Sequence, residues 1–337
     1  IHRVVLLLGA TETIAPYAEA YAHYIFIAAP FMICSFIMNN LLRFQGKASF
    51  AMVGITVGGL LNIALDPLFI FTLDMGTAGA ALATGLSQFI SFCILLWMCN
   101  HQDSCISISI RKFRPKLAIY REVLYGGIPS LGRQGIASVA TILMNFMCQP
   151  YGDAAIAAMS IVSRFMFFIN SVIIGFGQGF QPVCSYCFGA GLYDRVKKAC
   201  WFCIRVSTII LLVLSVISFP AARSIITLFR RNDPTVIEIG TLALRLQLIT
   251  LPLQGAVIMG NMMPQSIGYG FRATLVSTAR QGIFLIPLLT IMTYTIGLLG
   301  IQCAQPLADI ATFILSLFVI RGIFKEFPED ASSFAAQ

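Results

Sequence analysis

Long apolar segments separated by short polar ones dominate this sequence, and they leave few folds open to it. A helix of about 20 apolar residues is long enough to cross the hydrocarbon core of a bilayer. Nine segments reach that length: 16–40, 48–73, 77–99, 119–149, 154–186, 198–229, 236–263, 270–296 and 299–322. We therefore predict an all-α, polytopic membrane protein with about nine complete transmembrane helices. The short apolar run at residues 4–9 adds part of a further helix.

The composition argues against a soluble domain. Hydrophobic residues make up 58% of the chain and charged residues only 11%, whereas about a quarter of the residues of a soluble protein are charged. The net charge of +8 comes from basic residues dispersed among the apolar segments, which indicates membrane topology and not nucleic-acid binding. We expect the lipid bilayer as a partner, no nucleic acid, and a monomer.

The loop charges predict the orientation. Basic residues cluster after the first, third, fifth and seventh segments and in the tail, as at Arg43, Arg111 and Arg195. The opposite loops carry Asp74, Asp153 or a mixed turn at 230–233. The positive-inside rule therefore places the basic loops and the C-terminus in the cytoplasm of a multi-pass plasma-membrane protein.

An internal repeat divides the chain into two helical bundles. Pro30, Asn39 and Gly46 recur 222 residues later as Pro252, Asn261 and Gly268, and further Gly and Pro positions follow in the same order. Because the repeat joins segments with the same cytoplasmic loops, it is parallel. We expect the remainder of an N-terminal bundle at 1–100, a cytoplasmic linker at 101–118, a C-terminal six-helix bundle at 119–325 and a cytoplasmic tail at 326–337.

Residues 119–186 form the first two apolar segments of the second half of the repeat, and the first half contains no corresponding segments. We therefore expect a twelve-helix protein whose first half continues for about 100 residues before Ile1, by the rule of six spans per half. A longer reading frame upstream would support this expectation.

One acid stands out inside the apolar segments. Asp66 is the single ionisable residue between Ala48 and Phe71, and Asn62 precedes it by one helical turn. A carboxylate at that depth is expensive unless it is paired, protonated or facing water, so it indicates a functional site. Pro67 also loosens the helix beside it. The structural alternative is that Asp66 caps a kinked helix or contacts lipid headgroups.

Other chemistry finds little support. Cys184 and Cys187 form a CxxC pair, and Cys200 and Cys203 form another. Two such pairs can hold zinc, but here each pair is explained by an i, i+3 spacing on one membrane helix, and we expect no metal site. Motifs of metalloproteases, hydrolases and nucleotide-binding enzymes are absent from the sequence. We expect no enzymatic activity and no cofactor beyond a coupling ion.

Several ordered motifs resemble the multidrug and toxic compound extrusion (MATE) family, over nearly the whole chain. They are LLRFQG at 41–46, NIALDPLFIF at 62–71, GTAGAALAT at 76–84, GIPSLGRQG at 127–135, GQGFQP at 177–182 and FGAGLYDRVK at 188–197. The details are most similar to the bacterial branch typified by the staphylococcal exporter. The resemblance implies two helical bundles around a central cavity that export cationic or amphipathic drugs against proton or sodium entry.

The family pattern also implies a cation site in the first bundle, formed by Asn39, Asn62, Asp66 and Thr84. Another branch of the family uses acids in helices seven and ten, and that site cannot be transferred, because Arg133 and Gln134 stand in the former helix. The repeat position of Asp66 in the second half is Ile286. We therefore expect ion coupling to be asymmetric.

Six polar residues of the second half are candidates for the cargo cavity: Arg133, Gln134, Arg164, Gln178, Gln181 and Asn261. For the last three the alternative is an ordinary interhelical hydrogen bond. Arg133, Arg164 and Asp309 are the charges that we place deep in the second bundle, and Asp309 can offset one of the arginines. If Arg133 and Arg164 line the cavity, their positive charges would favour an anionic cargo, which is why we also consider that class of cargo.

The sequence therefore predicts a cation-coupled multidrug antiporter working by alternating access. One alternative is a flippase for a lipid-linked sugar or another amphipathic metabolite. A second is a membrane scaffold without transport, which a lipid-facing Asp66 would favour.

Overall fold

The computed structural model of the chain describes residues 15–101, 116–231 and 233–327, and all regular structure in these ranges is helical. The chain forms two compact units, residues 1–114 and 115–337, which we call unit 1 and unit 2 and describe separately. Most of the predicted linker at 101–118, the run at 4–9 and nearly all of the predicted tail lie outside the described residues.

The described part of unit 1 contains three long helices, α2 (Ala15–Phe44), α3 (Ala48–Pro67) and α4 (Gly76–His101), with the π-helical turn η1 (Leu68–Thr72) after α3. Helix α4 packs against both α2 and α3. Small residues allow the close approach: Gly54 lies against the Leu95 side chain, and the Ser91 hydroxyl donates a hydrogen bond of 2.9 Å to the Gly54 carbonyl. Such small-residue contacts are typical of helices that pack within a membrane.

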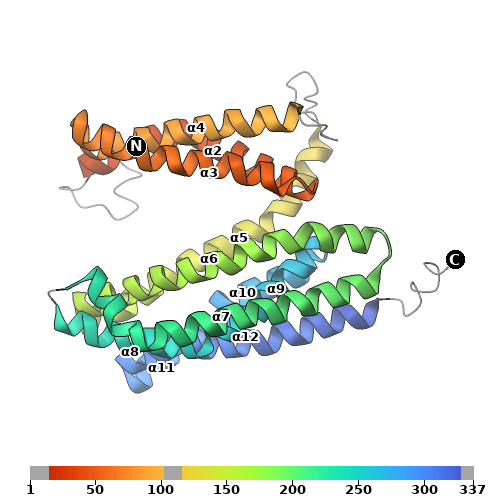
Figure 1. Cartoon of the computed structure of the whole chain (residues 1–337). Coiled ribbons are helices and arrows are strands. Elements are labelled where there is room, and N and C mark those ends of the chain that lie inside the picture. The colour runs from red at the N-terminus through yellow and green to blue at the C-terminus, as the bar shows by residue number, and fades with distance from the viewer. Residues whose placement is uncertain (1–14, 102–115, 232, 328–337) are drawn as a thin grey trace. The chain divides into compact units, whose positions relative to one another are not determined.

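Unit 2 contains the remaining helices (Figure 1). They are α5 (Leu117–Cys148), η3 (Gln149–Tyr151), α6 (Asp153–Gly189), α7 (Tyr193–Phe229), α8 (Pro234–Thr250), η4 (Leu251–Leu253), α9 (Gln254–Ser266), α10 (Gly270–Thr278), η5 (Ala279–Phe284), α11 (Leu285–Ile296) and α12 (Leu298–Glu326). Short 3₁₀ and π turns join α8 to α9 and α10 to α11, so each pair follows one continuous path. These irregular turns are tolerated where neighbouring helices satisfy the freed backbone groups.

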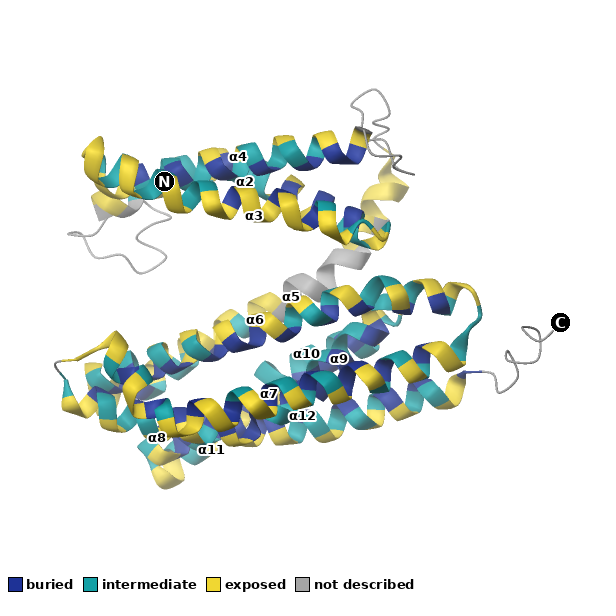
Figure 2. Ribbon diagram, viewed as in Figure 1, coloured by how far each residue is buried: buried dark blue, intermediate teal, exposed yellow. Residues whose placement is uncertain are grey.

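Burial follows the helix contacts in each unit (Figure 2). In unit 2, α6 packs against α7, α8 and α9, while α12 packs against α8, α9 and α11. Fully buried side chains such as Ile173, Leu211, Leu244 and Met259 fill the space between them. Many large apolar side chains on the outer faces are exposed, including Phe202. That pattern suits helices whose outer faces contact lipid.

Eight described helical segments are long and apolar enough to cross a membrane. They correspond to eight of the nine predicted segments. The ninth, 119–149, is the helix α5, whose sequence includes the charged residues Arg121, Glu122 and Arg133. The chain is thus an all-helical, polytopic membrane protein, and the number of its spans stays a prediction.

The internal repeat has a structural counterpart in a pair of matching hydrogen bonds. The Asn39 amide donates to the Ala51 carbonyl at 2.8 Å, and the Asn261 amide donates to the Ala273 carbonyl at 2.6 Å. Between each asparagine and its acceptor the chain turns at a glycine with positive φ, +77° at Gly46 and +85° at Gly268. The two units therefore build the same helix–turn–helix in the same way.

Candidate functional site

A polar cluster in unit 1 joins the end of α3 to α4. The Asn62 amide nitrogen donates to Asp66 Oδ1 at 3.2 Å and to Thr84 Oγ1 at 3.4 Å. The Thr84 hydroxyl in turn donates to the Ala80 carbonyl at 3.0 Å. Asp66 is partly buried within this unit. The structure therefore brings together three of the four residues predicted to form the cation site.

The local sequence explains this arrangement. Asn62 and Asp66 are one helical turn apart, so they project from the same face of α3. Gly79 allows α4 to approach closely, because a Cβ there would come within 2.7 Å of the Phe69 carbonyl oxygen. The approach places Thr84 opposite Asn62. Carboxylate, amide and hydroxyl oxygens are suitable ligands for a hard cation, and the carboxylate can also accept a proton.

Asn39 lies elsewhere in unit 1. Its amide is bonded to Ala51, which precedes Asp66 by fifteen residues on α3, a separation of about 22 Å along a helix. Its repeat counterpart Asn261 makes the same bond in unit 2. In the structure Asn39 therefore holds α2 against the start of α3 and does not contact the Asp66 cluster.

Unit 2 contains a cavity of about 460 Å³, lined by polar and apolar residues of α5, α6, α8, α9, η5, α11 and α12. Arg164, one of the predicted cavity residues, lines it. Gln181 makes a long contact of 3.5 Å with Gln265, and Asn261 makes the interhelical bond described above. Gln134 is exposed and Gln178 partly buried. The side chain of Arg133 lies outside the described part of the chain.

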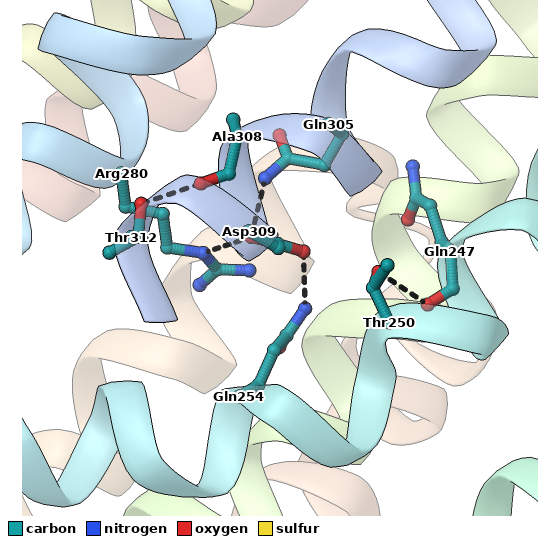
Figure 3. A network of polar contacts seen from close by, with 8 residues as sticks. All are labelled: Gln247, Thr250, Gln254, Arg280, Gln305, Ala308, Asp309 and Thr312. Carbon is teal, nitrogen blue, oxygen red and sulfur yellow. Dashed lines mark hydrogen bonds and ion pairs between the residues drawn. The ribbon is translucent and has the colours of Figure 1, made fainter. Parts of the chain in front are cut away.

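The wall of this cavity includes a network around Asp309 that sequence reasoning located only in part (Figure 3). Asp309 is 1% exposed. Its Oδ1 accepts from Arg280 Nε at 2.8 Å and from the Gln305 amide at 3.1 Å, and its Oδ2 accepts from the Gln254 amide at 2.8 Å. The carboxylate is therefore balanced by one arginine and two glutamines.

Arg280 is the residue that the sequence analysis missed. The expectation that Asp309 offsets an arginine named Arg133 and Arg164, but its ion-pair partner is Arg280. The signal was present, because Arg280 is the single charged residue between Arg272 and Asp309. An intramembrane cation of this kind needs a partner or a water-filled space.

The cysteine pairs do not form a recognisable metal site. Cys184, Cys187, Cys200 and Cys203 are buried and carry free thiols. Within the described ranges, no group of three or more potential ligands is arranged to hold a metal ion.

Known proteins resemble this chain along most of its length. A family model described as MatE matches residues 1–68 and 129–296. The multidrug export protein MepA of Staphylococcus haemolyticus is 27% identical over 328 residues, covering 97% of this chain and 72% of the relative. MepA of a bovine Staphylococcus aureus strain is 28% identical over 320 residues, covering 94% and 70%.

Solved structures agree with this fold. An outward-facing multidrug resistance MATE family transporter superimposes with a TM-score of 0.88 at 25% identity, covering 97% of this chain and 73% of that chain. A MATE structure in complex with MaL6 gives a TM-score of 0.89 at 24% identity, covering 97% and 74%. At 24% identity the second likeness concerns the fold alone.

Proposed function

Because the chain belongs to the MatE family, we propose that it is a multidrug exporter of the plasma membrane. In this proposal a proton or a sodium ion enters through unit 1, and cationic or amphipathic drugs leave by alternating access. The names of the staphylococcal relatives support drug export. The coupling ion and the substrate class are what the family resemblance implies, and the cluster of Asn62, Asp66 and Thr84 supports ion binding.

The observation that carries the proposal is the hydrogen-bonded cluster of Asn62, Asp66 and Thr84. A carboxylate within an apolar helix is stabilised when it binds a proton or a cation. Sodium binding requires the Asn62 amide to turn, so that its oxygen faces the ion in place of its nitrogen. A proton needs no such change, because protonated Asp66 still accepts from Asn62.

Coupling follows if the ion and the cargo favour opposite states of the transporter. A ligand shifts a conformational equilibrium only by its difference in affinity for the two states. Ion binding at Asp66 would stabilise one state through α3 and α4, and cargo binding would stabilise the other. Asp309 already forms an ion pair with Arg280. Of the two acids Asp66 and Asp309, this pairing supports Asp66 as the one that couples ion entry to export.

The test is efflux of a fluorescent cationic dye from proteoliposomes, with proton and sodium gradients imposed separately. The protein is expressed from its complete reading frame. Asp66→Asn should lower gradient-driven efflux at least about 10-fold, since it removes the titratable oxygen. Asp74→Asn is the matched control, because Asp74 lies in the exposed turn after η1 and has a φ of +51° that asparagine also tolerates. Undiminished uphill efflux by Asp66→Asn would exclude coupling through this residue.

A second candidate function is a flippase for a lipid-linked sugar or another amphipathic metabolite. The cavity of unit 2 favours it, because its lining includes Arg164, Arg280 and several amide side chains. A flippase would move a fluorescent anionic lipid-linked sugar between leaflets, and a drug exporter would not.

A further inference from the structure

We infer that the cavity of unit 2 binds the acidic group of an amphipathic cargo, and that Arg164 is the residue that holds this group. The inference rests on the proposed export function and narrows its cargo at this site, from cationic or amphipathic drugs to amphipathic compounds that carry an acidic group. It concerns the cavity of about 460 Å³ described above, which is large enough for much of a drug-sized molecule.

The described lining of the cavity offers no free carboxylate to a cationic cargo. Among the described residues that line it, none is an aspartate or a glutamate. The nearby Asp309 is 1% exposed, and both of its oxygens are occupied by Arg280, Gln254 and Gln305. A cationic ligand would have to displace Arg280 from Asp309, and separating a largely buried ion pair is unfavourable.

The charge that remains available is the guanidinium of Arg164. It makes no ion pair or hydrogen bond with any described residue, and its side chain is exposed at the cavity. Arg164 is eleven residues into α6, or about 16 Å from the start of the helix. An arginine within a membrane-spanning segment normally faces a cavity or a partner, and α6 is one of the candidate spans. A carboxylate, sulfonate or phosphate would supply that partner through two parallel hydrogen bonds.

Two amide side chains that line the same cavity, Gln254 and Asn170, each have a buried oxygen to which no described residue donates. Oε1 of Gln254 has no hydrogen-bond partner among the described residues, and its orientation is set by the amide nitrogen, which donates to Asp309. Oδ1 of Asn170 likewise accepts from none of the described residues. Buried acceptors of this kind are costly to leave unpaired, so they favour a ligand or a water that donates N–H or O–H groups. The cargo therefore combines an anionic group with neighbouring donors.

The rest of the lining suits an apolar body. Met144, Met159, Met166, Phe167 and Leu285 contribute apolar surface to the cavity. Methionine adapts its shape to varied ligands and makes favourable contacts with aromatic rings. An aromatic acid fits this combination better than a simple inorganic anion does.

Three dansyl probes of nearly equal size test the inference: dansylglycine, its neutral amide, and dansyl-ethylenediamine. The first is an anion and the third a cation at neutral pH. Binding to the purified protein is followed by dansyl fluorescence. We expect dansylglycine to bind at least about 10-fold more tightly than the cationic probe, a difference of about 1.4 kcal/mol.

Arg164→Gln should weaken dansylglycine binding about 10-fold or more and change binding of the neutral amide less than about twofold. Arg164→Lys should retain part of the affinity, since it keeps the charge but loses the planar pair of donors. Arg205→Gln is the matched control, because Arg205 is an exposed arginine within α7 that does not line the cavity. Thermal unfolding confirms that each variant is folded.

The inference is overturned if the cationic probe binds best, or if Arg164→Gln leaves dansylglycine binding unchanged. Failure of the proposed export function looks different. In that case wild-type protein binds dansylglycine through Arg164 but drives no probe out of proteoliposomes under either ion gradient.

Discussion

At the scale of single residues, the two deeply placed acids have different surroundings. Asp66 receives one amide donor from Asn62, and no basic side chain pairs with it in the part of unit 1 that the structure describes. Asp309 receives a guanidinium and two amides. In the proposed mechanism an ion binds Asp66 and leaves it again, whereas Asp309 already has a counter-ion in Arg280.

Removing that counter-ion should destabilise unit 2. In Arg280→Met the buried carboxylate of Asp309 loses its charged partner, and we expect a loss of about 3–5 kcal/mol of stability. The double variant Arg280→Met with Asp309→Asn should recover most of it, since the uncompensated charge is gone. Thermal unfolding in detergent measures both. A double variant no more stable than the single one would show that the ion pair is not the source of the loss.

The sequence alone was enough to predict the pairing of Asn62 with Asp66, but not the network around Asp309, and the difference has a physical reason. Asn62 and Asp66 share one helix face, so their spacing alone predicts contact. Arg280, Gln254 and Asp309 come from three separate helical segments. Their meeting depends on how the segments pack, which no local spacing encodes.

At the scale of helical elements, the repeat counterparts Asn39 and Asn261 show how each helix–turn–helix is held together. Asn39 is predicted by family resemblance to bind the coupling cation, yet it makes the same interhelical bond as Asn261. The internal repeat at residues 39 and 261 was visible in the sequence and indicated a shared role. The shared role is an interhelical hydrogen bond to the carbonyl of Ala51 or Ala273, and these acceptors are known only from the structure.

Alanine at each of these positions separates the two roles. We expect Asn39→Ala and Asn261→Ala each to lower stability by about 1 kcal/mol, as for one lost hydrogen bond, and to leave ion dependence of efflux intact. Loss of sodium or proton dependence in Asn39→Ala alone would instead make Asn39 a cation ligand.

The close packing of Gly300 at the start of α12 predicts which glycine of this helix tolerates substitution. A Cβ at Gly300 would overlap the carbonyl group of Met292, whereas a Cβ at Gly322 on the same helix would meet nothing within 4 Å. Gly300→Ala should therefore reduce folded protein strongly. Gly322→Ala should be neutral or stabilising by up to about 1 kcal/mol. Fluorescence-detected size-exclusion chromatography compares the two, and equal yields would contradict the observed packing.

At the scale of the whole molecule, hydropathy was sufficient to predict an all-helical membrane protein, because helices are the simplest way to satisfy the backbone within lipid. The apolar segments at 48–73 and 77–99 match α3 with η1 and α4 closely. Hydropathy did not reveal the π turns η1 and η5 or the 3₁₀ turn η4, because their geometry depends on packing against neighbouring helices.

The loop charges make a further prediction about the whole molecule. If the basic loops are cytoplasmic, a fluorescent protein fused after Gln337 should fold and fluoresce inside the cell. An alkaline phosphatase fused at the same position should be inactive. Active phosphatase would reverse the proposed orientation and, with it, the direction assigned to export.

The central claim is that ion binding at Asp66 drives cargo outward. Its most direct measurement is ion movement itself: proteoliposomes receive a dye gradient, and internal pH and sodium are recorded as the dye crosses. Wild-type protein should move protons or sodium against the dye in a fixed ratio, while Asp66→Asn moves the dye downhill without them. Equal ion movement in both proteins would contradict the account.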